Sequence, residues 1–200
     1  VLHAGEAADT VDFCQEKETH FRNDLVPGDL NTPEESHALT TSHILTEEDK
    51  DMALECMELM LSSESAKDSL NGILCKIGQY YQADRVYILM LTEGKQIMTM
   101  LNEWVGPGKY KIQHSISGKK TASFPVIANY AVNPAQVILT RQTEDKSSWQ
   151  YAIFPMDSDK DSEQMLCIEN PRKNMNCTAL IQKLLPYLIR ERRRVRDVRT

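Results

Sequence analysis

The sequence predicts an α/β fold of the α+β type: a central antiparallel sheet of five to six strands, with N- and C-terminal helices packed on one face. Three observations support this. Apolar residues recur at helical spacing near both ends of the chain. Between them lie short segments with β-branched or alternating apolar residues, which are typical of strands. Short polar turns join the first two and the last two of these segments as antiparallel hairpins, and helices at both ends then cover the sheet.

The composition is that of a globular protein with one main domain. The chain has 200 residues, of which 41% are hydrophobic and 26% charged, and no apolar run approaches the ~20 residues of a membrane span. The first residues form no signal peptide, and an initiator Met is missing, so we expect a cytoplasmic fragment of a longer protein. The five cysteines are odd in number and form no CxxC pair, which favours reduced thiols.

Charge divides the chain into unequal parts. Residues 1–50 carry 12 acidic and 3 basic residues, whereas residues 183–200 carry 2 acidic and 7 basic ones. This polarity argues against a uniform nucleic-acid-binding surface. We expect residues 1–45 to be an acidic linker or arm, or the tail of an upstream domain. Residues 46–64 form an N-terminal helix, residues 65–190 form the domain, and residues 191–200 form a basic linker.

Two helices open the folded part. Thr46-Glu47-Glu48-Asp49 approximates a capping box, and an apolar stripe follows it (Met52, Cys56, Leu59, Met60). Ser65 to Asp68 repeats the signal, and the core-facing positions behind it are Leu70, Ile73, Leu74, Ile77 and Tyr81. A last helix from about Thr178 contains Pro186, so we expect a kink or a missing hydrogen bond near Gln182.

Five strands are predicted between the helices, at residues 85–91, 96–105, 137–140, 149–154 and 164–168. Polar turns at residues 92–95 and 157–162 make hairpins of the first and last pairs. Asp157, Asp159 and Asp161 resemble the start of a calcium loop. The sixth and twelfth places hold Ser162 and Ile168 instead of Gly and an acid, so we read a solvated turn.

Two clusters of residues resemble GAF domains of bacterial signalling proteins. The first runs through Ile77-Gly78-Gln79-Tyr80-Tyr81, Ala83 to Ile88 and Asn102-Glu103-Trp104. The second comprises Ala152 to Pro155 and Met165 to Arg172, which contains Ile-Glu-Asn-Pro-Arg. The resemblance covers about 120 residues. It implies a sensory or regulatory module that binds a small molecule or a partner, pairs with a second copy through its terminal helices, and relays to an output domain.

The chain departs from the family in its middle. Residues 109–146 are short and idiosyncratic, and Asn133-Pro134 breaks any helix begun at Ser123. Neither the signature of cyclic-nucleotide-binding members nor a bilin attachment site is present, so the resemblance names no cofactor. Residues 196–200 faintly resemble the opening of a diguanylate cyclase (GGDEF) domain, which makes this the expected output domain. A histidine kinase is the alternative.

The resemblance and the aromatic content together predict a ligand pocket on the face away from the terminal helices. The candidate lining residues are Glu103, Trp104, Tyr110, Phe124, Tyr130 and Trp149. For aromatic residues at strand ends, a place in the core is the alternative. Arg85 and Glu103 lie on strands expected to pair, and they could form a salt bridge or contact a ligand.

We expect no catalytic residues and no metal. The five histidines are scattered without ligand spacing, and nucleophile elbows and phosphate-binding glycine loops are missing. Free methionine sulfoxide reductases share the GAF fold and use paired cysteines. Cys56, Cys75 and Cys167 have core-like surroundings, which disfavours that activity. A ligand-free structural dimerisation module is the other alternative.

Overall fold

The computed structural model describes residues 45–142, 148–173 and 178–198. Its helices are α1 (Glu47–Ser62), α2 (Ala66–Tyr80), α3 (Gln113–Ile116), the 3-10 turn η1 (Thr121–Ser123), α4 (Pro125–Val132) and α5 (Ala179–Asp197). Its strands are β1 (Arg85–Thr92), β2 (Ile97–Val105), β3 (Lys119–Lys120), β4 (Val137–Gln142), β5 (Ser148–Ser158) and β6 (Glu163–Glu169). No helix in the described ranges is long and apolar enough to cross a membrane.

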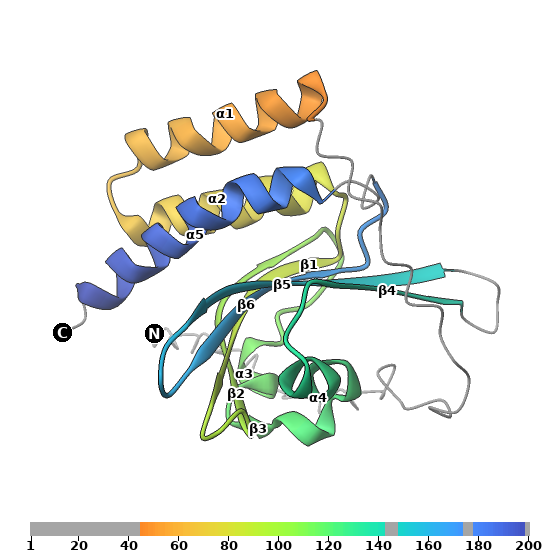
Figure 1. The fold of residues 1–200 in the computed structure, drawn as a ribbon. Coiled ribbons are helices and arrows are strands. Elements are labelled where there is room, and N and C mark those ends of the chain that lie inside the picture. The colour runs from red at the N-terminus through yellow and green to blue at the C-terminus, as the bar shows by residue number, and fades with distance from the viewer. Residues whose placement is uncertain (1–44, 143–147, 174–177, 199–200) are drawn as a thin grey trace, which may run out of the picture.

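The strands form one antiparallel sheet in the order β3-β2-β1-β6-β5-β4. Helices α2 and α5 cover one face, and α1 lies over them as an outer layer (Figure 1). The segment with α3, η1 and α4 lies against the opposite face (Figure 1), which we call the far face. The predicted fold class, an antiparallel sheet with terminal helices on one face, is therefore confirmed.

Strand alternation divides the core in two. On β1, Val86 and Ile88 join the cluster under the helices, whereas Tyr87, Leu89 and Leu91 join the other. We call the latter the far-face cluster; its buried members are Tyr87, Leu89, Leu91, Met98, Met100, Ile116, Ile127, Tyr130, Tyr151, Ile153, Met165 and Cys167. Successive strand residues point to opposite faces, so the same strands contact both clusters.

The helix starts follow the predicted capping chemistry. The Thr46 side chain accepts a hydrogen bond from the backbone N–H of Asp49, and the Asp49 carboxylate accepts one from the N–H of Thr46. At the start of α2 the Ser65 side chain likewise accepts a hydrogen bond from the backbone N–H of Asp68. Both caps satisfy backbone donors that a helix start would otherwise leave unpaired.

The structure adds elements that the sequence patterns did not reveal. Strand β3 has two residues and α3 has four, both too short for a periodic signal. Helix α5 passes through Pro186 as one continuous helix. Pro186 has no N–H to donate to the carbonyl of Gln182, which is the missing hydrogen bond that the sequence predicts. Pro186 and Gln182 both lie on the exposed side of the helix, where water can bind that carbonyl.

The turn at residues 157–162 forms as expected and has an additional partner. One Asp159 oxygen accepts hydrogen bonds from the backbone N–H groups of Asp161 and Ser162. Arg193 of α5 binds both oxygens of Asp157, at 2.9 and 2.8 Å. The basic end of α5 is thus held against the acidic turn between β5 and β6.

Candidate functional site

The centre of the far face holds two tyrosine hydroxyls and a thiol. Tyr87 comes from β1, Tyr151 from β5 and Cys167 from β6, the strand between them. The two hydroxyl oxygens are 2.5 Å apart, and the Cys167 side chain is hydrogen-bonded to Tyr151. All three residues are at most 4% exposed. A buried polar group of this kind can orient a bound molecule or specify the packing of a core.

These groups are held in their neutral forms. Burial raises the pKa values of Tyr87 and Tyr151 well above 10, and neighbouring groups including Cys167 add to the effect. Burial also raises the pKa of the Cys167 thiol to about 12, although its bond with Tyr151 opposes this. The site therefore offers hydrogen-bond donors and acceptors at neutral pH, and it offers no reactive thiolate.

A charged rim borders the far-face cluster at one end of the sheet. The Arg85 guanidinium donates to Glu169 at 2.7 Å and to the backbone carbonyl of Tyr110 at 3.1 Å. Its Nε atom lies 3.9 Å from a carboxylate oxygen of Glu103. Burial raises the pKa of Glu169 despite the positive charge of Arg85. Arg85 thereby ties three separate segments together.

Glu103 binds backbone N–H groups at the start of α3, in the segment that lies against the far face. Its two carboxylate oxygens accept hydrogen bonds from the N–H groups of Ile112 and Gln113, at 2.9 and 3.2 Å. These donors begin α3, where a negative charge is favourable. A bulge in β2 opposite Ile88 and Leu89 reverses the strand's alternation, which turns Glu103 towards the far face. Between its salt bridge and ligand interpretations, the geometry favours the structural one.

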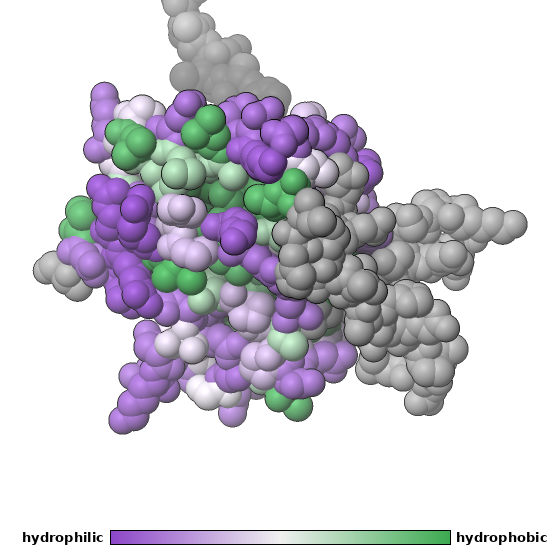
Figure 2. Space-filling view, turned by 45° about the horizontal axis from the view of Figure 1, so that its top comes forward, coloured by the Kyte–Doolittle hydropathy of each residue, from purple (hydrophilic) through white to green (hydrophobic). Residues whose placement is uncertain are grey.

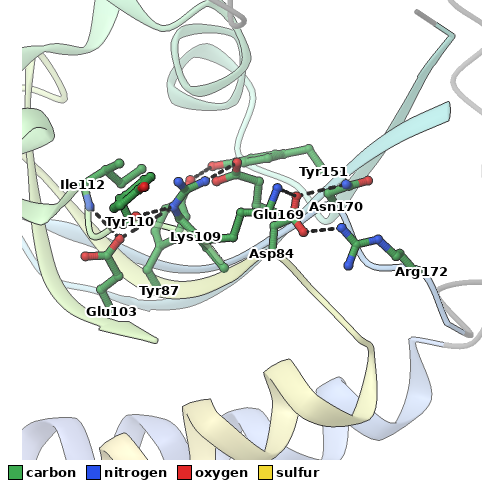
Figure 3. Close-up of polar contacts among 11 residues, drawn as sticks. Asp84, Tyr87, Glu103, Lys109, Tyr110, Ile112, Tyr151, Glu169, Asn170 and Arg172 are labelled. Atoms are coloured by element: carbon green, nitrogen blue, oxygen red, sulfur yellow. Dashed lines mark hydrogen bonds and ion pairs between the residues drawn. The ribbon is translucent and has the colours of Figure 1, made fainter. Parts of the chain in front are cut away.

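Asp84 forms a second polar centre just before β1 (Figure 3). Its carboxylate pairs with Lys109 at 2.9 Å, accepts a hydrogen bond from Asn170 at 3.1 Å, and pairs with Arg172. Burial opposes ionisation, but the Asn170 bond and the two positive charges outweigh it and lower the pKa of Asp84. The two sequence clusters that carry the family resemblance thus meet at this carboxylate.

The predicted pocket residues lie in different places. Phe124 packs against the far-face cluster and Tyr130 belongs to it. Trp104 lies on the other face of the sheet, against Gly78 of α2. Tyr110 is 82% exposed, and its backbone rather than its ring contacts the rim. Trp149 is on β5, and its side chain lies outside the described part of the structure.

Sequence reasoning missed the residues at the centre of the site. Tyr87, Tyr151 and Cys167 were predicted to lie on strands, without a face, and Glu169 follows the last predicted strand directly. Odd-numbered positions of β1 and β6 point to the far face, and so do Tyr151 and Ile153 of β5, before that strand's register shifts. Assigning a face to each strand by alternation would have grouped them. Among the described residues, no three His, Cys, Asp or Glu side chains are arranged to hold a metal ion.

Solved structures with a similar fold include GAF domains and an enzyme. The GAF domain of an Acinetobacter phosphoenolpyruvate-protein phosphotransferase has a TM-score of 0.53 and 14% identity over 77% of this chain and 98% of its own. A phycoerythrobilin-bound GAF domain from a cyanobacterial phytochrome has a TM-score of 0.51 and 11% identity, covering 78% and 100%. Free methionine-R-sulfoxide reductase from Neisseria meningitidis, solved with its substrate, has a TM-score of 0.51 and 10% identity over 81% of this chain and 99% of its own.

These likenesses show that the chain has a GAF-like fold. No protein-family model matches the sequence, and no curated protein sequence matches it. At 10–14% identity the comparisons extend to the fold alone.

Proposed function

We propose that this chain is a regulatory module of a bacterial cytoplasmic signalling protein. A small molecule or a partner binds at the far face, and binding changes the position of the terminal helices. A downstream output domain of the same protein, for which a diguanylate cyclase is the expectation, responds to that change. The chain itself performs no catalysis.

The sheet supports this proposal because its central strands contact both layers. Tyr87 of β1 lies in the far-face cluster, and its neighbours Val86 and Ile88 pack under the helices. On β5, Tyr151 and Ile153 alternate with Ala152 and Phe154 in the same manner. A closely packed core transmits a displacement on one face to the other.

The contact between α5 and the β5–β6 turn provides a route for the relay. Arg193 pairs with Asp157, and Arg196 lies 3.9 Å from Asp159. Asp157 belongs to β5, the strand that carries Tyr151 into the far-face cluster. A ligand would act only through a different affinity for two positions of α5, which is a population shift.

Helix α1 supplies a surface for pairing with a second copy. Leu54, Met57 and Leu61 are 55%, 39% and 86% exposed, and their spacing places them on one stripe. Figure 2 shows hydrophobic residues among hydrophilic ones on the side of the molecule where α1 lies. A homodimer through the terminal helices would cover this stripe and couple the two outgoing helices.

A thermal-shift screen of a metabolite library tests the proposal. We expect at least one compound to raise the melting temperature, because a ligand that binds only the folded state stabilises it. Tyr151→Phe should weaken that shift. Tyr80→Phe is the matched control, since it removes a hydroxyl on the helix side that donates to Asp49 at 2.7 Å. A screen without hits, or equal losses in both variants, would count against a far-face ligand.

A ligand-free dimerisation module is the second candidate. It is favoured because the far face is packed by the protein's own side chains. Ile127 and Tyr130 of α4 belong to the far-face cluster and are only 4% and 1% exposed. The same screen separates the two, because this candidate predicts no thermal shift and a concentration-dependent dimer in sedimentation.

Reductase chemistry predicts a reactive thiol, and we expect none at Cys167. With a pKa of about 12 in place of 9, its thiolate population at pH 8 is about 1,000-fold smaller than that of an ordinary cysteine. Native alkylation with iodoacetamide, followed by mass spectrometry, should leave Cys167 unmodified until the protein unfolds. Rapid modification of Cys167 at neutral pH would revive the reductase candidate.

A further inference from the structure

We propose that α4 is a gate over the far-face cluster, and that Glu163 holds it shut by binding Tyr130 and Lys95. The inference rests on the proposed function, because it explains how a ligand reaches a face that is packed in this structure. It concerns four elements: α4, the turn between β1 and β2, the start of β6, and the buried groups beneath.

Helix α4 is a short unit that can be displaced from the sheet as one piece. It has eight residues. Pro125 is suited to its first position, and Pro134, which follows Asn133, prevents the helix from continuing. Ile127 and Tyr130 point into the far-face cluster, whereas Val132 is 86% exposed. Val126 and Ala131 also pack against the cluster but are only partly buried. Two fully buried side chains therefore hold α4 down, and local opening is favoured where buried contacts are few.

The contacts of Glu163 with Tyr130 and Lys95, which we call the latch, join α4 to both hairpins. The Tyr130 hydroxyl donates to one oxygen of Glu163 at 2.8 Å, and Lys95 Nζ lies 2.7 Å from the other oxygen. Glu163 begins β6, and Lys95 lies in the β1–β2 turn. The Glu163 side chain is 12% exposed, so water screens the two contacts only in part.

Helix α4 packs on the same buried cluster that contains the polar centre of the far face. Tyr130 and Cys167 belong to one buried cluster, and they are close enough for the thiol to contribute to the raised pKa of Tyr130. Displacing α4 would uncover the hydroxyls of Tyr87 and Tyr151 together with the apolar surface around them. The chemistry revealed fits a small, mostly apolar molecule with a hydrogen-bonding group.

The buried thiol makes opening measurable without a ligand. In the full chain, with Cys167 as the sole cysteine, its rate of reaction with N-ethylmaleimide reports how often the far face opens. A second variant with Cys56 alone reports the helix side, where that thiol is also buried. We expect Tyr130→Phe and Glu163→Ala to accelerate labelling of Cys167 about tenfold or more, because each removes a hydrogen bond to a carboxylate from the closed state.

The controls separate gating from general loosening. Val132→Ala, on the exposed side of α4, should leave the Cys167 rate unchanged, and labelling of Cys56 should stay slow in every latch variant. If Tyr130→Phe does not fold, Lys95→Ala removes the other contact and should give a smaller acceleration. An unchanged Cys167 rate, or equal acceleration at Cys56, would overturn the gate. A failed ligand screen would instead count against the proposed function and leave this measurement standing.

Discussion

Replacing Gly78 by Ala should destabilise the domain by about 3 kcal/mol, because a core without free space cannot accept the added carbon. A Cβ atom at Gly78 would lie 2.1 Å from both Cε3 and Cζ3 of Trp104. The Trp104 ring is rigid and packs between α2 and β2, so the helix or the strand must shift. The gain of about 1 kcal/mol for Ala over Gly in a helix is too small to compensate.

Gly72→Ala is the matched control, in the same helix. There the nearest atom to an added Cβ would be Leu59 Cδ1 at 3.3 Å, the mobile end of a flexible side chain. We expect this variant to be neutral or up to about 1 kcal/mol more stable. Urea unfolding of the two variants measures the difference. Similar stabilities would mean that α2 and β2 do not approach each other as closely as the structure shows.

Asp84→Asn should cost about 2 kcal/mol of stability at pH 7. Asp84 is 6% exposed and joins residues from three segments through Lys109, Asn170 and Arg172. Removing one member of a buried ion pair typically costs about 3–5 kcal/mol. The Lys109 and Arg172 side chains are 38% and 54% exposed, so solvent screening justifies a smaller figure.

The pH dependence of this loss identifies its electrostatic origin. Since the folded pKa of Asp84 is lowered, its contribution is complete above the unfolded pKa of about 3.9 and disappears as pH falls towards the folded value. The stability difference between wild type and Asp84→Asn should therefore shrink below about pH 4. The raised pKa of Glu169 gives stability the opposite dependence on pH. Glu169 is present in both proteins, so its contribution largely cancels in the difference between them. A difference that is constant from pH 3 to pH 7 would assign the loss to packing.

The regular elements of this fold were predictable because their signals are local. Capping residues at Thr46 and Ser65 set the starts of α1 and α2, and alternation identified β2. The face of each residue on β2 was not predictable, since a bulge inserts one residue and reverses the alternation. Glu103 and Trp104, adjacent in sequence and both predicted for the pocket, lie on opposite faces as neighbouring strand residues do. The bulge determines that Glu103, and not Trp104, points to the far face.

The candidate site depended on pairing that is not local. Tyr87 and Tyr151 are 64 residues apart and meet because β6 lies between β1 and β5. Nothing in either segment alone indicates that order. The family resemblance was more informative than any single spacing. Its first cluster contains Asp84 and its second contains Asn170, and these two side chains are hydrogen-bonded to each other. The resemblance therefore reflects a contact that stabilises this end of the sheet.

A far-face ligand should change the position of the terminal helices. Spin labels at Ser62, the exposed last residue of α1, and at Val198, at the exposed end of α5, report the distance between the two helix ends. We expect the compound that raises the melting temperature to shift the distance distribution in wild type, and to shift it less in Tyr151→Phe. Identical distributions with and without the bound compound would contradict the relay, even if binding itself were confirmed.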